Sequence, residues 1–188
     1  MLTYIEEDQK YLKIAGFRGL TIRDSEEFMK SSFQEKNSDI WVQFFDADLI
    51  ATWEHLYFAV LNALLAYRNK RNISKTVAME TMIFASAQRQ IRKAITILGV
   101  KESSSNVAVV VIGDKPEIVQ TSFSEIEKCL AAVADESVLE LTEEKTKNLC
   151  KAFGITEKEL KAVGAESNNE QAIVNLVIER MALMQTQL

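Results

Sequence analysis

The segment from residue 68 to residue 93 concentrates positive charge, in residue types that bind phosphate. Its seven cationic side chains stand against one carboxylate, that of Glu80. Because the 188-residue chain has a formal net charge of −5, this segment at +6 leaves −11 for all other residues. The acidic total argues against indiscriminate nucleic-acid binding, whereas the local asymmetry favours one anionic ligand. The seven cations are Arg68, Lys70, Arg71, Lys75, Arg89, Arg92 and Lys93.

The spacing within this segment predicts one amphipathic helix over residues 75–98. Its inner face is apolar and comprises Val77, Phe84, Ala87, Ile91, Ala94, Ile95 and Leu98. Its outer face mixes cations with methionine and serine and comprises Lys75, Met79, Met82, Ser86, Arg89 and Lys93. Cations for phosphates, apolar surface for bases and small residues for close approach suit a single-stranded nucleotide chain. An exposed face with incidental methionines fits the pattern equally well, so both interpretations stay open.

Glu80 breaks this pattern, because the helical spacing places it on the inner face. An unpaired carboxylate is costly to bury. We therefore expect Glu80 to be buried and paired, either with His55 or with backbone N–H groups near the start of its helix.

The motifs of most enzymes are missing from the sequence. It contains no phosphate-binding glycine loop, no dinucleotide-binding fingerprint and no zinc-protease motif. His55 is the one histidine, and on a largely apolar helix a hydrogen-bonded structural role is favoured over that of a general base. We therefore predict no catalytic residue, no metal and no cofactor. The alternative hypothesis is a small α/β enzyme or effector-binding domain with a pocket near His55 and Glu80.

The sequence also indicates the cellular compartment. No apolar run is long enough to span a membrane, and the N-terminal residues lack the features of a secretory signal. Cys129 and Cys150 lack metal-ligand spacing, so we expect two buried thiols in a reducing compartment. These features predict a cytoplasmic protein.

The predicted elements form a single α/β domain over residues 1–188, with a small mixed, largely antiparallel sheet covered by several helices. Strands are predicted as a hairpin of 2–5 with 11–17, at 39–45, at 106–114 and, more weakly, at 137–141. Helices are predicted after Asp24, over 47–68, from Pro116, from Thr156 to Gly164 and over 169–186. The apolar residues of the last helix spread beyond one stripe, which predicts a surface for a partner.

Several stretches together resemble a known family. "FDADLIATWEHLYFAVLNALLAY" is followed by "RNISKTVAMETMIFASAQRQIRKAITILGV", "VAVVVIGD", "FGITEKEL" and "VIERMALM". In this order they resemble the small regulatory subunit of the KEOPS (EKC) complex, the family of the PRPK-binding protein. The most specific part is "NISKT" with Glu80, "FAS" and "RQI", joined to the terminal "IERMAL".

The resemblance implies a noncatalytic regulatory subunit in tRNA modification. The complex installs threonylcarbamoyl on the adenosine next to the anticodon of certain tRNAs. Its small subunit binds the atypical kinase/ATPase and, in archaeal members, the 3′ CCA end of tRNA, with no small-molecule substrate and no membrane contact.

The resemblance also assigns residues to these two roles. The implied tRNA-binding residues are Arg68, Lys70, Arg71, Lys75, Met82, Ser86, Arg89 and Lys93. The implied kinase-binding residues lie on the last helix and are Val174, Ile178, Met181 and Met184. Family members commonly have glycine at or near the position of Ala87.

Overall fold

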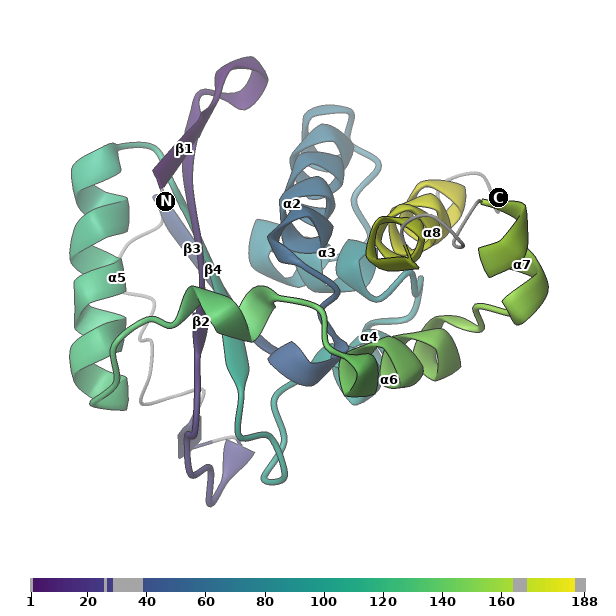
Figure 1. Ribbon diagram of the computed structural model, residues 1–188. Helices are drawn as coiled ribbons and strands as arrows, with labels where there is room; N and C mark the ends of the chain where they lie inside the picture. Colours follow the sequence, from purple (N-terminus) through teal and green to yellow (C-terminus); the bar gives the residue numbers. More distant parts are fainter. Residues whose placement is uncertain (1, 26, 29–38, 164–168, 185–188) are drawn as a thin grey trace.

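The computed structural model describes residues 2–25, 27–28, 39–163 and 169–184, in which four strands form one sheet (Figure 1). The strands are β1 (Leu2–Ile5), β2 (Lys10–Phe17), β3 (Ile40–Asp46) and β4 (Val107–Gly113). Their order is β1-β2-β4-β3, and each of these three pairings is antiparallel. The predicted α/β class, the hairpin and both later strands are confirmed. The expected mixed character is not seen among the described strands.

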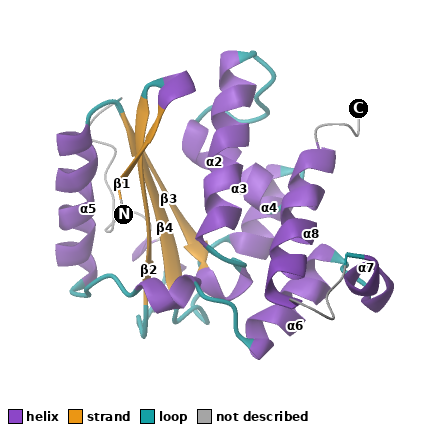
Figure 2. Ribbon diagram, turned by 45° about the horizontal axis from the view of Figure 1, so that its top comes forward, coloured by secondary structure: helices purple, strands orange, loops and turns teal. Residues whose placement is uncertain are grey.

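Helices cover both faces of this sheet (Figures 1 and 2). Helix α5 (Pro116–Leu130) covers one face, and α2 (Trp53–Arg68) with α3 (Val77–Ala85) lies over the other. On the side of α2 and α3 also lie α4 (Ile91–Leu98), α6 (Glu143–Phe153), α7 (Glu157–Ala162) and α8 (Asn169–Met184). Three short 3₁₀ helices complete the described elements: η1 (Glu6–Asp8), η2 (Ala47–Leu49) and η3 (Glu136–Leu139). Most of the helix predicted after Asp24 falls on 29–38, outside the described residues.

The central strand β4 is buried along its whole length. Its side chains alternate between two cores, with Val110 packed toward α2 and α3 and Val109 packed toward α5. Alternation of β-branched residues on a strand covered by helices on both faces accounts for the continuous apolar run.

The prediction of one helix over 75–98 is wrong, because the chain breaks it between α3 and α4. Ala87 adopts a left-handed conformation with φ 51°. Its N–H donates to the Phe84 carbonyl at 2.9 Å, and the Gln88 N–H donates to the Ile83 carbonyl at 3.2 Å. This pair of bonds is a Schellman motif, which ends a helix and usually has glycine at the left-handed position. Alanine there hid the break from the sequence pattern.

The weak strand predicted at 137–141 is also wrong, because η3 occupies most of it. The Asp135 side chain caps η3 by accepting from the Ser137 N–H at 3.0 Å. A Cβ on Gly16 of β2 would lie 2.6 Å from Cβ of Val138, so glycine is required for η3 to pack on the sheet. A close contact between distant segments thus overrides the local strand preference.

Helix boundaries with explicit sequence signals agree with the predictions. Pro116 starts α5, and α7 starts after Thr156, which forms a capping box with Glu159. Gly154 ends α6 with φ 63°. The end predicted at Gly164 lies outside the described residues.

The prediction that α8 presents its spread of apolar residues to a partner is wrong for most of them. Val174 packs in a core with α6 and α7, whereas Met181 and Met184 pack in the core shared with α2 and α3. Ile178 is half-buried between the two cores. Because α8 faces two cores of its own chain, its apolar residues occupy more than one stripe.

The two cysteines differ from the expected pair of buried thiols. Cys129 is exposed on α5 and Cys150 is half-buried on α6. Burial raises the pKa of the Cys150 thiol. No helix in the described part of the chain is long and apolar enough to cross a membrane.

Candidate nucleic-acid interface

The basic segment begins where α2 ends, and hydrogen bonds fix its shape. Lys70 is left-handed with φ 55°. Its N–H donates to the Tyr67 carbonyl at 3.0 Å, and the Arg71 N–H donates to the Ala66 carbonyl at 2.8 Å. This second Schellman motif turns the chain off α2 and presents the exposed side chains of Lys70 and Arg71.

Glu80 holds the loop that follows. Its carboxylate is fully buried and accepts from the Ile73 N–H at 3.0 Å and from the Ser74 N–H at 2.7 Å. The Ser74 hydroxyl lies 2.8 Å from the same carboxylate. The prediction that Glu80 is buried and bound by backbone N–H groups near the start of its helix is confirmed, and His55 is not its partner.

Side chains from both helices secure the same loop. The Tyr67 hydroxyl of α2 donates to the Ser74 carbonyl at 2.9 Å, and burial is the main cause that raises the pKa of this phenol. Thr76 caps α3 by accepting from the Met79 N–H at 3.2 Å. The loop is therefore fixed at its centre and at both ends.

A cavity of about 480 Å³ opens beside this loop. It lies between the end of α2, the loop, α3 and the last turn of α8, and it brings together residues that are 119 positions apart in the sequence, from 65 to 184. Its lining combines two arginines, a phenylalanine, an amide and aliphatic side chains: Leu65, Ala66, Asn69, Arg71, Ile73, Glu80, Phe84, Arg89 and Met184.

Arg71 and Arg89 are the two predicted tRNA-binding residues that line this cavity. Arg89 follows the break after α3, and its guanidinium lies 3.5 Å from the Met184 carbonyl. Lys70 and Lys75 are exposed on the adjoining loop, and Lys93 is exposed on α4. The break at Ala87 thus places Arg89 at the cavity rather than on a continuous helical stripe.

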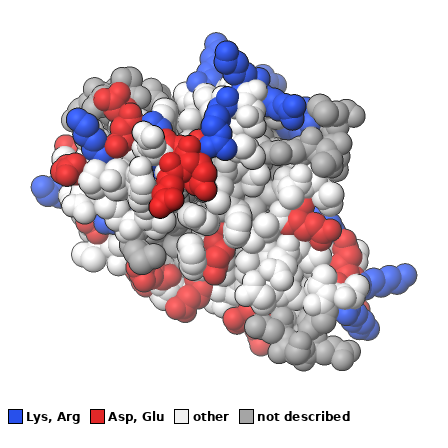
Figure 3. Space-filling view, turned by 90° about the horizontal axis from the view of Figure 1, so that it is seen from above, with Lys and Arg blue, Asp and Glu red and all other residues white. Residues whose placement is uncertain are grey.

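Arg68 is exposed, but it is engaged with an acidic turn. Its guanidinium forms an ion pair with Asp8 at 3.1 Å and donates to the Glu7 carbonyl at 3.2 Å. Figure 3 views the molecule from above Figure 1, and on the face that it shows, Lys and Arg side chains gather along one edge beside a group of Asp and Glu side chains.

Met82 and Ser86 do not lie on an outer face, and this part of the prediction is wrong. Met82 is 2 % exposed and Ser86 is 1 % exposed. The Ser86 hydroxyl donates to the Ile83 carbonyl at 3.0 Å. Both residues belong to α3 or its C-cap, and α3 is buried nearly all round between the sheet and α2. Neither side chain reaches a ligand in this conformation.

His55 has the structural role that the sequence favoured. It is fully buried, its Nδ1 accepts from the Ala51 N–H at 3.2 Å, and its Nε2 lies 2.8 Å from the Ala85 carbonyl. Burial is the main cause that lowers its pKa to about 4. It is not among the residues that line the cavity with Glu80.

The residues that line the cavity are better suited to binding a nucleotide than to catalysis. Guanidinium groups at the cavity can bind phosphate, the exposed Ile73 side chain offers apolar surface to a base, and the Asn69 amide can bond a base edge. Within the described residues no cluster of His, Cys, Asp and Glu suits a metal ion.

The family described as kinase binding protein CGI-121 has a sequence model that matches residues 21–185. The chain belongs to this family. Membership confirms the resemblance seen in the sequence, and the matched range includes every residue that lines the cavity.

Curated relatives of this CGI-121 chain come from an archaeon and from fungi. The regulatory protein Cgi121 of Methanocaldococcus jannaschii is 33 % identical over 119 residues, which cover 63 % of this chain and 74 % of that protein. The EKC/KEOPS complex subunit CGI121 of Coccidioides immitis is 28 % identical over 123 residues, which cover 65 % of this chain and 58 % of that protein. The EKC/KEOPS complex subunit cgi121 of Aspergillus terreus is 26 % identical over 97 residues, which cover 52 % of this chain and 50 % of that protein.

Several lining residues of this CGI-121 chain were not predicted as site residues. Phe84 was assigned to the inner face of the supposed helix, and Asn69 was given no ligand-binding role. Leu65 and Ile73 carried no signal. Their convergence depends on the turn after α2 and on the Glu80 carboxylate, which a spacing pattern does not describe.

Proposed function

We propose that the protein is a noncatalytic subunit of a KEOPS complex that binds the complex's kinase/ATPase and the 3′ CCA end of tRNA. Membership in a kinase-binding family and the names of its relatives support the complex and the kinase. The observation that carries the RNA role is the cavity that Arg71, Arg89 and the exposed Ile73 line together. In this role the protein serves the formation of N6-threonylcarbamoyladenosine without performing the reaction.

The RNA end would enter the cavity along the basic loop. Lys70 and Lys75 would contact phosphates outside, Arg71 and Arg89 would contact phosphates at the cavity, and a terminal base would pack on the exposed Ile73. Glu80 would contribute indirectly, because its charge is satisfied by the loop that it holds. An unpaired 3′ end suits such a site, since its bases are free to leave the stack.

The kinase contact would use the outer side of α8, because its inner residues are committed to the chain's own cores. Ile178 is half-buried, and Leu183 in the last turn is 41 % exposed. Burial of apolar side chains that are exposed in the free protein favours association with a partner.

Charge-reversal variants test the RNA role. Arg71→Glu and Arg89→Glu should each weaken tRNA binding at least about tenfold, since each replaces a phosphate contact by a repulsive charge. Lys128→Glu is the matched control, because Lys128 is exposed on α5 across the sheet. Fluorescence anisotropy with labelled tRNA measures all three. Equal affinities for the wild type and the two arginine variants would contradict the assignment.

A further inference from the structure

The acidic turn η1, which consists of Glu6, Glu7 and Asp8, lies at the tip of the hairpin formed by β1 and β2. The hairpin tip and the end of α2 lie at the same end of the molecule (Figure 1). The Arg68 guanidinium joins them, because it forms an ion pair with Asp8 at 3.1 Å and donates to the Glu7 carbonyl at 3.2 Å. The acidic turn thus directly adjoins the basic segment.

The position of η1 is fixed from both sides of the turn. Ile5, just before it, is 2 % exposed and packs in the core shared with α2. Gln9, just after it, is left-handed with φ 52°, and its N–H donates to the Glu6 carbonyl at 3.3 Å. Lys10 then forms an ion pair with Asp114, which follows β4. The carboxylates of η1 are therefore held in a defined place relative to α2.

The contact with η1 keeps Arg68 away from a ligand. One terminal nitrogen, Nη1, makes both contacts, so the guanidinium is fixed against the turn. The Asp8 side chain is 12 % exposed. A phosphate could take over the guanidinium only by leaving this largely buried carboxylate without its counter-ion, which is unfavourable.

The other two carboxylates of η1 face solvent. Glu6 and Glu7 are exposed, and neither forms an ion pair with any residue that the structure describes. Arg68 contacts this turn, and the next residue, Asn69, lines the basic cavity. Exposed charges act over about 10 Å at 0.1 M ionic strength. Glu6 and Glu7 should therefore repel phosphates along one border of the cavity.

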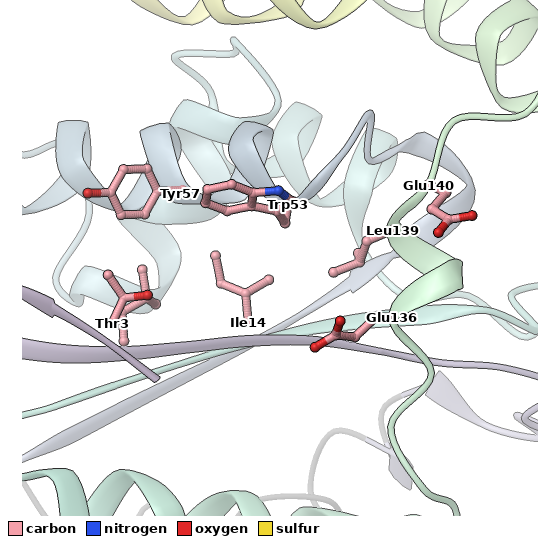
Figure 4. Close-up of a pocket in the computed structure, with 8 residues that line it drawn as sticks. Thr3, Ile14, Trp53, Tyr57, Glu136, Leu139 and Glu140 are labelled. Carbon is pink, nitrogen blue, oxygen red and sulfur yellow. The ribbon is translucent and has the colours of Figure 1, made fainter. Parts of the chain in front are cut away.

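Carboxylates at the opposite end of α2 are too distant to have this effect. A second cavity, of about 380 Å³, lies beside Trp53 at the start of α2, and Glu136 and Glu140 line it (Figure 4). The 16 residues of α2 span about 24 Å, which is more than twice the screening length. Glu140 is exposed and therefore provides a control carboxylate.

We propose, on the basis of the RNA role proposed above, that η1 and Arg68 form an acidic barrier that sets one boundary of the RNA-binding surface. Asp8 and the Glu7 carbonyl keep Arg68 out of contact with RNA, and the carboxylates of Glu6 and Glu7 repel phosphates from the hairpin. The RNA is thereby confined to the basic loop and the cavity. Arg68 belongs to the barrier and not to the RNA contacts.

Variants of the ion pair test the barrier. Asp8→Asn releases Arg68 for a phosphate, so it should raise the affinity for tRNA at least about threefold and steepen the slope of log K against log salt by about 0.7. Adding Arg68→Ala to Asp8→Asn should return the affinity to within about twofold of the wild type, because Arg68 makes no RNA contact there. Glu140→Gln also removes one negative charge and should change the affinity less than about twofold. Fluorescence anisotropy with labelled tRNA at several salt concentrations measures all of these.

A second pair of substitutions tests the repulsion separately. Glu6→Gln combined with Glu7→Gln leaves Arg68 paired with Asp8 and should raise the affinity for tRNA at least about twofold, because two charges near the phosphates are removed. Glu125→Gln on α5 combined with Glu140→Gln is the matched control and should leave the affinity unchanged.

The outcomes distinguish the barrier from the RNA role itself. If Arg71→Glu weakens tRNA binding while Asp8→Asn binds like the wild type, the barrier is overturned and the RNA role stands. The barrier is also overturned if the variant that lacks both Asp8 and Arg68 binds more than about threefold more weakly than the wild type, because Arg68 would then contact RNA. Equal affinities for the two glutamine pairs would overturn the repulsion. An Arg71→Glu variant that binds like the wild type would overturn the RNA role, and the barrier with it.

Discussion

At the scale of single residues, Glu80 illustrates how a buried carboxylate determines the shape of a loop. Glu80→Ala should lower the free energy of unfolding by about 1–3 kcal/mol, since the N–H groups of Ile73 and Ser74 would lose their acceptor. Urea unfolding measures the loss, with Glu125→Ala on the exposed face of α5 as the control. Identical midpoints for Glu80→Ala and the control would contradict the role given to this carboxylate.

His55 makes stability depend on pH in mildly acidic solution. Its folded-state pKa is about 4, below the ordinary value of 6.5. Between these two pH values the imidazole binds a proton in the unfolded chain but stays neutral in the folded chain. Stability should therefore fall as pH falls through this window, by about 1 kcal/mol from pH 7.5 to about pH 5.5. Urea unfolding at the two pH values measures the fall. An NMR titration of the His55 ring with a midpoint near its ordinary value would contradict the prediction.

At the scale of elements, the sequence predicted those boundaries that carry explicit signals. Pro116 and the capping box at Thr156 are local signals, and the starts of α5 and α7 were placed correctly. The end of α2 at Arg68 was predicted correctly, although Lys70 takes the left-handed position without glycine. The end of α3 was missed because Ala87 takes that position without glycine. The helical spacing of hydrophobic residues continued across the break at Ala87. The outer face predicted from that spacing therefore included residues that are buried.

Ala87→Gly should stabilise the protein by up to about 1 kcal/mol, because the left-handed conformation costs alanine more than the added freedom of glycine costs in the unfolded chain. Thermal unfolding measures the gain. Ala182→Gly is the opposite control, since Ala182 is exposed within α8, and it should lower stability by about 1 kcal/mol. Destabilisation by both substitutions would contradict the strain assigned to Ala87.

The placement of α8 separates a core residue from a surface residue in its last turn. Met181 is 0 % exposed, so Met181→Glu should cost at least about 3 kcal/mol by burying an unpaired charge. Leu183→Glu should leave folding largely intact and weaken binding to the kinase, since Leu183 lies at the surface. Circular dichroism melts and calorimetric titration with the kinase measure the two effects. A Met181→Glu variant that melts like the wild type would contradict the burial of this side of α8.

At the scale of the whole molecule, positive charge is concentrated in one region. The acidic chain carries one basic segment, and the fold places that segment at the end of α2 beside a cavity that joins α2, α3 and α8. The sequence could locate the charge, because it is contiguous. It could not locate the cavity, since Arg71, Phe84 and Met184 meet only after the helices pack.

The account's central claim is that this cavity receives the 3′ end of tRNA. The most direct measurement is the affinity of the full-length protein for one tRNA with its CCA end intact and for the same tRNA with those nucleotides removed. We expect removal to weaken binding at least about tenfold, because it takes away the bases and phosphates that enter the cavity. The same affinity for both RNAs would contradict the account.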